Sequence, residues 1–203
     1  MGKLQWKPGN MIYPVPAVIA TCGDSPDNYN GITIAWTGTI CTNPPMTYIS
    51  VRPNRHSYDL IKRTGEFVIN LTTEDLVFAT DYVGVKSGRE EDKMNLMNLT
   101  LIEGTKVKAP LIEESPVNIE CKVVEIKELG SHHMFLAEVV AVNVDEKYMD
   151  DKNKFHLDWS KPICYSHGEY FSLGKKLGSF GYSIMKKKTK KKKGKKTKKE
   201  QSK

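Results

Sequence analysis

The sequence predicts a mainly β protein into which a few short helices are inserted. Runs rich in Val, Ile and Thr alternate with short polar turns, and the two longest runs, residues 117–127 and 134–144, lie close together in the chain. Strands of that length are typical of a barrel wall. The helical segments do not alternate regularly with the strands, which argues against a doubly wound parallel sheet.

The expected strands are bounded by residues that favour turns. Gly23-Asp24-Ser25-Pro26-Asp27-Asn28 follows the first strand, and Asn43-Pro44-Pro45 precedes the third. Residues 128–133 separate the two longest strands and predict a hairpin with an irregular loop. In chain order we expect strands over residues 17–22, 30–38, 46–51, 66–71, 117–127, 134–144 and 162–165.

Short helices are expected between the strands on local signals. The first ends before Gly65, a residue that commonly follows a helix. Thr72 or Thr73 is expected to cap the second, whose first turn is acidic. The three helical segments are expected over residues 56–63, 75–82 and 93–99, with a polar loop over residues 84–92.

The charge is unevenly distributed along the chain. The 203 residues carry a formal net charge of +7, but residues 186–203 hold twelve Lys and one Glu. That segment has a net charge of +11, so residues 1–185 carry a net charge of −4. A low-complexity Lys segment cannot bury apolar area and is expected to be disordered. We therefore expect one domain over residues 1–185 and a disordered Lys-rich tail over residues 186–203.

The four cysteines, Cys22, Cys41, Cys121 and Cys164, lie far apart in the sequence. They form no C-x-x-C pair and no spacing with His that is typical of zinc, so we expect reduced thiols and no metal site. No apolar stretch is long enough to cross a membrane. These features predict a cytoplasmic protein without a membrane span.

The strand expected over residues 30–38 offers a face to a flat ligand. Alternation puts large apolar side chains on one face and small or hydroxylated side chains on the other. The second face lets a flat ligand approach the backbone and find hydrogen-bond partners. An ordinary antiparallel sheet with one solvated face fits the same pattern. The first face comprises Ile32, Ile34 and Trp36, and the second comprises Thr33, Ala35 and Thr37.

The following strand carries groups that suit a phosphate. Ser50 and Arg52 share a face with Met46 and Tyr48, because side chains two residues apart point the same way. A hydroxyl and a guanidinium so placed can both bond to the oxygens of one phosphate group. The sequence therefore predicts positive charge near the small-residue face.

Several short motifs occur in order over roughly residues 10–184. They are Asn30-Gly31-Ile32-Thr33-Ile34-Ala35-Trp36, Asn43-Pro44-Pro45, Ile49-Ser50-Val51-Arg52, His56-Ser57-Tyr58, Glu66-Phe67-Val68-Ile69-Asn70, Ser87-Gly88-Arg89-Glu90-Glu91-Asp92-Lys93, and the segment from Tyr170-Phe171-Ser172-Leu173-Gly174 through Gly181-Tyr182-Ser183. The ordered set resembles the signature of the flavin reductase-like family, and more narrowly its flavoredoxin branch. No single motif is specific, so the resemblance rests on their order.

This resemblance implies a six-stranded antiparallel split β-barrel that binds FMN at the interface of a homodimer. It also implies hydride or electron transfer through the flavin in the cytoplasm. A partly buried phosphate needs cations or several hydrogen-bond donors. Carried over by position, the residues at the isoalloxazine ring and ribityl chain would be Thr33, Ala35, Trp36, Thr37 and Gly38. Those at the ribityl phosphate would be Ser50, Val51, Arg52, His56 and Ser57, with Lys93 as a further cation.

Two positions have alternative interpretations. Lys93 can equally be a solvated helix charge. His133 matches a family His near the nicotinamide or flavin, but Ser131-His132 stands where the family has Gly-Asp, and an exposed turn His explains it as well. The incomplete motif leaves two activities open. One is a reductase that uses NAD(P)H, and the other, slightly favoured, is a carrier that exchanges electrons with a redox partner protein.

The Lys-rich tail indicates a different class of function. Such a segment can bind nucleic acid, anionic lipid or an acidic protein through its charge. It has no aromatic residues to stack on bases, so any polyanion binding would be nonspecific. The alternative to a redox protein is therefore a non-enzymatic flavin- or nucleic-acid-binding module that the polybasic tail localises. A solvated tail without a partner is the simplest interpretation of the charge block.

Overall fold

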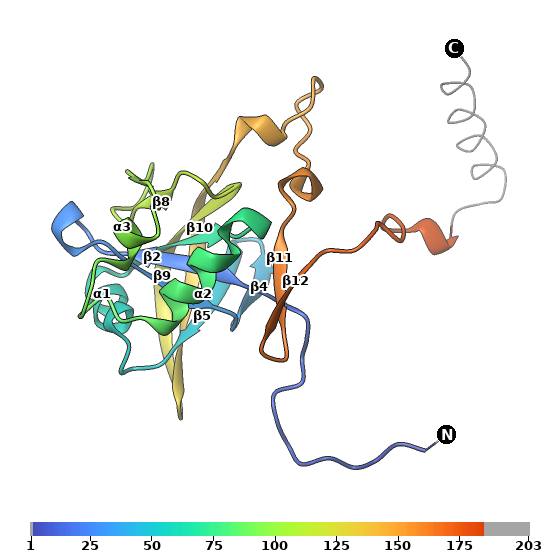
Figure 1. Ribbon diagram of the computed structural model, residues 1–203, viewed down its shortest axis with the longest axis horizontal. Helices are drawn as coiled ribbons and strands as arrows, with labels where there is room; N and C mark the ends of the chain where they lie inside the picture. Colours follow the sequence, from blue (N-terminus) through green and yellow to red (C-terminus); the bar gives the residue numbers. More distant parts are fainter. Residues whose placement is uncertain (1, 185–203) are drawn as a thin grey trace. The chain divides into compact units, whose positions relative to one another are not determined.

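The computed structural model describes residues 2–184 of the chain (Figure 1). Residues up to Leu173 form one compact unit, and a second unit begins at Gly174. Within the described part of the second unit, Tyr182–Ile184 form a single 3₁₀ turn, η5. The disordered tail expected over residues 186–203 lies outside the described residues, and the domain boundary at residue 185 stays a prediction.

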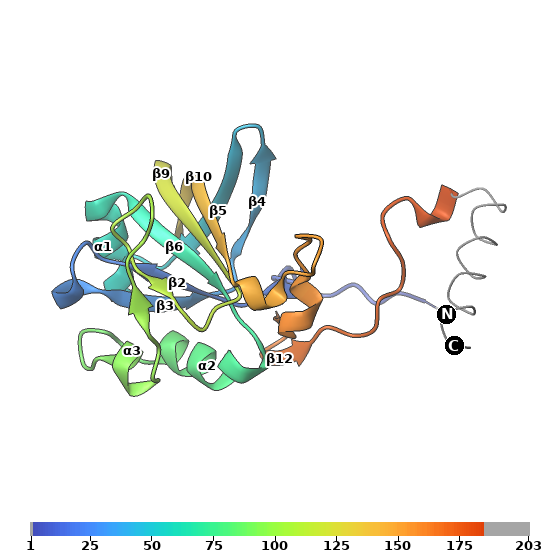
Figure 2. The ribbon, with the colours of Figure 1, turned by 90° about the horizontal axis from the view of Figure 1, so that it is seen from above.

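The first unit is built on a seven-stranded antiparallel sheet with the strand order β3-β2-β6-β9-β10-β5-β4 (Figure 1). Figure 2 shows β6, β9, β10, β5 and β4 side by side, with α2 on the far side of β2 and β3. The predicted mainly β fold with few short helices is confirmed. The strands are β2 (Val18–Cys22), β3 (Asn30–Ile34), β4 (Thr37–Thr42), β5 (Pro45–Val51), β6 (Glu66–Leu71), β9 (Val117–Leu129) and β10 (His132–Val144).

The two edge strands of this sheet, β3 and β4, are consecutive in the chain. Only Ala35 and Trp36 separate them, and these two residues form a bend where a continuous strand over residues 30–38 was expected. The Trp36 carbonyl accepts a hydrogen bond of 2.9 Å from the Ser50 amide, so the bend is fastened to the end of β5. If β3 and β4 are counted as one bent strand, the sheet has the six strands that the resemblance implied.

The hairpin of β9 and β10 is more regular at its turn than expected. The ladder runs as far as the pair Leu129 and His132, leaving only Gly130 and Ser131 in the turn. Gly130 has a φ of 57°, which suits a tight hairpin turn. The predicted irregular loop over residues 128–133 is therefore wrong. The irregularities lie within the ladder, where the register shifts near Ala137 and again before Ala141.

Three α-helices follow the predicted order: α1 (His56–Thr64), α2 (Val77–Val85) and α3 (Lys93–Leu96). Gly65 adopts the left-handed conformation and ends α1, as expected. The start of the second helix differs, because a 3₁₀ turn, η2 (Glu74–Leu76), precedes α2. Neither Thr caps it through its side chain: the Thr73 hydroxyl makes no cap bond, and the Thr72 hydroxyl donates to the Ala17 carbonyl at 2.6 Å.

The remaining elements are short. β1 (Val15–Pro16), β11 (Ile163–Ser166) and β12 (Glu169–Ser172) form a three-stranded sheet, and β7 (Leu101–Ile102) pairs with β8 (Leu111–Ile112). Only the first strand of the β11–β12 hairpin was predicted. Over residues 2–184, no helix is both long and apolar enough to cross a bilayer. The other 3₁₀ turns are η1 (Pro26–Asn28), η3 (Glu146–Tyr148) and η4 (Leu157–Ser160).

The apolar core has two parts. Inside the curved sheet, buried side chains from strands distant in sequence meet, including Ile49, Phe67 and Phe135. A second cluster lies between β2 and the helices and includes Ile19, Val83 and Met94. Because β2 contributes to both clusters, its residues Val18–Cys22 are all buried. Side chains thus pack on both faces of the sheet. This packing fixes the positions of the strand edges that surround the site.

A buried carboxylate anchors the loop before β8. Glu120 is 0% exposed, and it accepts hydrogen bonds from the Thr105, Lys106 and Val107 amides and from the Thr105 hydroxyl and the Asn143 amide group. Burial alone would raise its pKa, but the hydrogen bonds from Thr105, Lys106 and Asn143 outweigh burial and lower the pKa to about 2.

We expect Glu120→Gln to lower the free energy of unfolding by about 2–3 kcal/mol, since an amide cannot accept all these bonds and its NH₂ faces donors. In the native protein this contribution is present above the unfolded pKa of about 4.5 and is lost as the pH falls towards 2. Urea unfolding at pH 7 and pH 4 measures both effects. Glu125→Gln, on an exposed part of the same strand, is the control. Equal stability of the two variants would contradict this role.

Candidate functional site

Three neighbouring hollows form one groove beside the edge of the sheet. The cationic hollow, about 340 Å³, lies between α1 and the loop after α2. It shares Ile32, Arg52 and Arg55 with the middle hollow, about 130 Å³. The middle hollow meets the wide hollow, about 600 Å³, at Ala35, Trp36, Ser50, Arg52 and His132. These two shared walls make the groove continuous from one end to the other.

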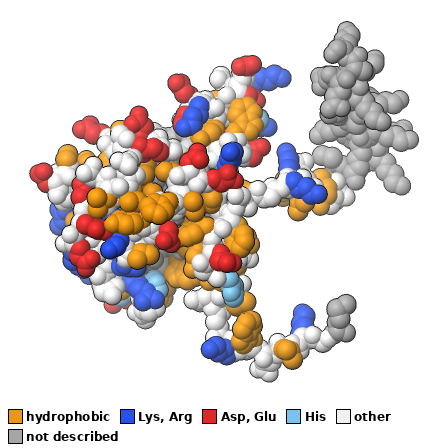
Figure 3. Space-filling model, in the orientation of Figure 1, with side chains coloured by type: hydrophobic (Ala, Val, Ile, Leu, Met, Phe, Trp, Pro, Cys, Tyr) orange, Lys and Arg blue, Asp and Glu red, His pale blue; other side chains and the backbone are white. Residues whose placement is uncertain are grey.

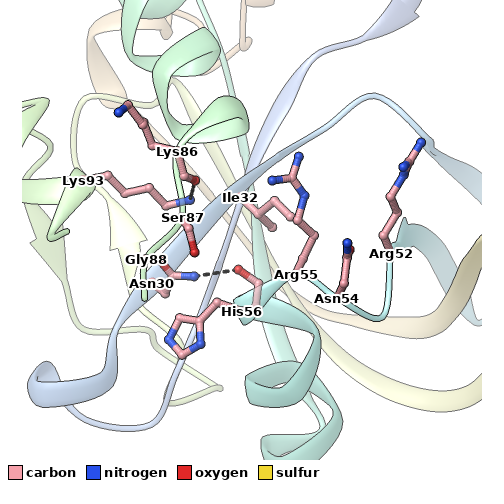
Figure 4. Close-up of a pocket in the computed structure, with 11 residues that line it drawn as sticks. Asn30, Ile32, Arg52, Asn54, Arg55, His56, Lys86, Ser87, Gly88 and Lys93 are labelled. Atoms are coloured by element: carbon pink, nitrogen blue, oxygen red, sulfur yellow. Dashed lines mark hydrogen bonds between the residues drawn. The ribbon is translucent and has the colours of Figure 1, made fainter. Parts of the chain in front are cut away.

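The cationic hollow has two walls and a floor. The chain entering α1 supplies Arg52, Asn54, Arg55, His56 and Ser57, across from the loop residues Lys86, Ser87 and Gly88 (Figure 4). Lys93 lines it from α3, and Asn30 and Ile32 from β3. None of the described residues that line this hollow is acidic, although four of them are Lys or Arg. The hollow is therefore suited to an anion with several oxygen atoms.

Close packing shapes the floor of this hollow. The Asn30 amide donates to the Ser57 hydroxyl at 2.8 Å, and Ser57 is only 1% exposed. A Cβ atom on Gly88 would lie 2.2 Å from the Asn30 side-chain oxygen, so no larger residue fits at that position. The polar side chains of β3 and α1 are thus held in place by one another and by the loop after α2.

Lys93 is buried and held by the end of α2. Its ammonium donates to the Val83 carbonyl at 2.8 Å and to the Lys86 carbonyl at 3.0 Å, and the residue is 3% exposed (Figure 4). Burial, together with the positive charge of Arg55, lowers the pKa of Lys93 to about 8. The interpretation of Lys93 as a solvated helix charge is therefore wrong.

Two further cations share this environment. Arg55 donates to the Gly84 carbonyl at 3.1 Å, which directs it towards the end of α2. Burial lowers the pKa of His56, the positive charges of Arg89 and Lys93 lower it further, and Asp59 acts in the opposite direction. A bound anion would oppose this lowering of the pKa and favour the charged form of His56.

The bend between β3 and β4 changes the expected alternation. Ile32 and Ile34 share a face, as predicted, and both are buried in the core, while Thr33 points the other way and donates to the Thr80 carbonyl of α2. After Ile34 the alternation stops. Trp36 therefore leaves the core face and lines the middle and wide hollows together with Ala35. The prediction that Trp36 shares a face with Ile32 and Ile34 is wrong.

The pairing of β5 with β10 separates groove residues from core residues. Ser50 lies opposite Met134, and both line the wide hollow. Val51 lies opposite His133, on the face that points into the core. The predicted common face of Met46, Tyr48, Ser50 and Arg52 is confirmed by the alternation of burial, since Thr47, Ile49 and Val51 are buried and these four residues are not. Val51 is 1% exposed and still adjoins the middle hollow.

This register assigns different surroundings to the two adjacent His residues. His132 lines the middle and wide hollows, whereas His133 lines none of the three. The His133 Nδ1 atom lies 2.8 Å from the Tyr58 hydroxyl, and the two rings pack edge to face at 5.3 Å. His133 is thus neither an exposed turn residue nor a wall of the groove, and its neighbour His132 is the His that lines the groove.

Most predicted site residues line the groove. Thr37 lines the wide hollow and donates to the Tyr48 carbonyl at 2.6 Å, whereas Gly38 faces the Tyr48 ring and lines none of the three hollows. Cys41 lines none of them either and is half-buried. The predicted residues found in the groove are Thr33, Ala35, Trp36, Thr37, Ser50, Val51, Arg52, His56, Ser57 and Lys93.

Sequence reasoning missed several groove residues. Asn54 and Arg55 lie two and three residues after the predicted Arg52, and only the loop geometry turns both into the cationic hollow. The wide hollow also gains a wall from Met11 and Ile12, which precede the first strand of the sheet. The motif Ser87-Gly88-Arg89 could have indicated the loop wall of the cationic hollow, because its Gly permits close packing against a neighbouring segment. The missed residues also include Asn30, Lys86, Tyr48 and Met134.

We expect the protein to gain stability from Lys93 as the pH rises through about 8. Because the unfolded chain binds this proton up to a pKa of about 10.5, it holds more protons than the folded chain between these values, so unfolding becomes less favourable with rising pH. Wild type should gain about 2 kcal/mol over Lys93→Met between pH 8 and pH 10. Urea unfolding across this range measures the difference, and parallel curves for the two proteins would contradict the depressed pKa.

Comparison with known proteins agrees with this geometry. The chain matches the model of the flavin reductase like domain over residues 10–174. It is similar to the structure of flavoredoxin of Desulfovibrio vulgaris (Miyazaki F), with a TM-score of 0.83 and 28% identity over 91% of this chain and 100% of that chain. Flavoredoxin from Methanosarcina acetivorans gives a TM-score of 0.82 and 27% identity over the same shares.

A sequence relative points the same way. An uncharacterized protein of Archaeoglobus fulgidus is 33% identical over 141 residues, which are 70% of this chain and 78% of that protein. The family model spans the whole sheet and every residue of the groove except Gly9, and the two flavoredoxin structures are covered over their full length. The chain therefore belongs to the flavin reductase-like family, in its flavoredoxin branch.

Proposed function

We propose that the chain is an FMN-binding redox protein. Membership of the flavin reductase-like family supports a flavin-related redox function. The observation that carries the choice of FMN is the single groove with a cationic end, a narrow middle and a wide, more apolar end. FMN has the same sequence of parts: a phosphate, a ribityl chain and a tricyclic ring.

The cationic hollow fits the phosphate. Phosphate monoesters carry between one and two negative charges near pH 7, and they need cations or several donors when partly buried. Arg52, His56 and Lys93 would supply positive charge, and the Ser57 hydroxyl a hydrogen bond. Arg55, which sequence reasoning did not select, adds a second guanidinium. The donor set and the lack of acids among the described lining residues fit such a group.

The other two hollows fit the rest of the cofactor. Thr33, Ala35 and Ser50 present small or hydroxylated side chains to the middle hollow, which leaves room for a ribityl chain. Trp36 and Tyr48 line the wide hollow with Met134 and would contact a ring. We keep Thr37 at the ring and assign Gly38 a supporting position behind Tyr48. Val51 would contact the ribityl chain, because it lines the edge of the middle hollow.

The protein's own contribution to the reaction is position and environment. When bound, FMN supplies a ring that accepts hydride or electrons. Trp36, Tyr48 and Met134 would exclude water from one side of the ring, and the cations would hold the phosphate at a fixed distance from it. Hydride transfer needs no general acid from the protein, which agrees with a groove whose only titratable groups near the wide end are Tyr48, Arg52 and His132 among the described residues.

We expect Arg52→Ala to weaken FMN binding about tenfold, because it removes a charge-assisted bond to the phosphate. Riboflavin, which lacks the phosphate, should bind both proteins equally. Arg52 is exposed, so the variant should fold normally. Fluorescence titration of each flavin into the flavin-free protein measures both affinities. If the wild type prefers riboflavin, or takes up neither flavin and is colourless when purified, the proposal is wrong.

Two activities remain within this proposal. The chain either passes electrons between FMN and a redox partner protein, or it uses NAD(P)H to reduce flavin. We favour the carrier, because both solved structures reported above are flavoredoxins and because His133, the residue proposed for the nicotinamide side, is engaged by Tyr58. If the chain is a reductase, His132 is better placed to meet a nicotinamide, since it lines the wide hollow.

We expect slow NAD(P)H oxidation with free FMN as acceptor, and no loss of that rate in His133→Ala. Rapid turnover in the wild type would instead identify a reductase. In that case His132→Ala should raise the KM for NAD(P)H several-fold, because His132 lines the groove, and His133→Ala should not. Steady-state kinetics with both nicotinamide cofactors separates these outcomes. The two His variants are matched, since they are adjacent on β10 and change the same number of atoms.

A homodimer belongs to the same proposal. Figure 3 shows hydrophobic side chains gathered over the face that carries α2 and the β11–β12 hairpin. Phe78 is 72% exposed there, Val85 67% and Phe171 48%, and such a face is typical of an interface. A solution mass equal to one chain would contradict the dimer.

The alternative function rests on the Lys-rich tail, which lies outside the described residues. A flavin- or nucleic-acid-binding module localised by that tail would lose polyanion binding when residues 186–203 are removed. The net charge of −4 on residues 1–185 argues against nucleic-acid binding by the body. Nucleic-acid binding that survives the truncation would overturn this version.

A further inference from the structure

Arg89 joins the two walls of the cationic hollow without lining it. The residue belongs to the loop after α2, directly after Ser87 and Gly88, which form one wall. Its guanidinium donates to the Asn54 carbonyl at 3.0 Å and to the Asp59 carboxylate on α1, also at 3.0 Å. Asn54 belongs to the opposite wall. One side chain therefore spans from the loop to the chain that enters α1.

Hydrogen bonds within the loop after α2 also fix the residues next to Arg89. The Arg89 amide donates to the Ser87 hydroxyl at 3.2 Å, and the Glu90 amide donates to the Ser87 carbonyl at 3.1 Å. Ser87 and Gly88 are thus held in a turn that presents them to the hollow. A shift of Arg89 would move these two residues, because they are its immediate neighbours.

The bridge is exposed and therefore easily opened. The Arg89 side chain is 49% exposed and the Asp59 side chain 65%. Exposed ion pairs contribute little to overall stability. Such a pair can break without unfolding the protein, and a local opening between the two walls is then the main consequence of its loss.

We propose that Arg89 and Asp59 form a clasp that holds the two walls of the cationic hollow together and slows the release of a bound phosphate monoester. This inference rests on the proposed FMN site and adds a positioning residue to it. Arg89 acts through Asn54 and Ser87 and does not touch the phosphate. The clasp lengthens the time for which FMN stays bound.

Charge offers a sharp test, because the two partners carry opposite signs. If Arg89 acted only by its positive charge on the phosphate, Arg89→Ala would speed release of FMN and Asp59→Asn would slow it. If the two residues act as a clasp, each substitution breaks the same bridge and both speed release. The double variant should then release FMN no faster than Arg89→Ala, which already removes both the Asp59 and the Asn54 contacts.

The experiment is stopped-flow measurement of FMN release from the full chain, with riboflavin as the second ligand. We expect each single variant to release FMN roughly threefold to fivefold faster, as an exposed ion pair allows, and riboflavin at the wild-type rate. Arg89→Lys should restore only part of the retention, since an ammonium cannot reproduce the guanidinium fork. Arg63→Ala, which breaks the exposed Arg63–Asp24 pair at the other end of α1, should leave both rates unchanged.

The outcomes separate this inference from the proposed function. A wild type that binds neither flavin overturns both. A wild type that prefers FMN, with release rates unchanged in both variants or changed in opposite directions, overturns the clasp alone. Equal acceleration of FMN and riboflavin release would show a general loosening of the groove and would also overturn it.

Discussion

The bend at Ala35 and Trp36 is the constraint on which the rest of the site depends. Up to Ile34 the strand alternates between the core and α2, as any half-buried strand does. The bend ends that alternation and lets the chain continue as β4 at the opposite edge of the sheet. The hydrogen bond from the Ser50 amide to the Trp36 carbonyl holds it there. Without the bend, Trp36 would follow Ile32 and Ile34 into the core, and the middle and wide hollows would lose their common wall.

The concentration of positive charge beside this bend also has a structural cause. The last carbonyls of a helix have no partners within the helix and carry partial negative charge. Lys93 binds the Val83 and Lys86 carbonyls, and Arg55 binds the Gly84 carbonyl, all at the end of α2. The helix end thus compensates these cations without an acidic side chain. An anion can therefore be attracted to the hollow without first displacing a carboxylate.

The walls of the groove differ in how firmly they are held. Its floor and its strand walls are packed against the core, as the burial of Ser57, Val51 and Lys93 shows. Its outer walls are loops that exposed side chains join. This arrangement suits the proposed cofactor, whose ring must be held in one orientation.

Much of the fold follows from local pattern in the sequence. The alternation of Met46, Tyr48 and Ser50 with Thr47, Ile49 and Val51 correctly predicts which face of β5 is buried, because one strand obeys one period. The end of α1 at Gly65 and the whole of β6 are likewise local properties. The tight turn at Gly130 and Ser131 was missed because the pairing of β9 with β10 continues further than the apolar runs do.

The sequence by itself determined the period of β5, the end of α1, the separation of an acidic body from a basic tail, and ten of the residues that line the groove. The tertiary structure alone decided which cations meet and which His reaches the groove. Arg55 and Lys86 meet in one hollow because the chain entering α1 reaches the end of α2, where Arg55 donates to the Gly84 carbonyl, and His133 is turned to the core by its pairing opposite Val51. Both outcomes depend on register and packing between segments that are distant in the chain. A local sequence pattern does not show how a strand will pair with its neighbours, and it is this pairing that decides which face of the strand is buried.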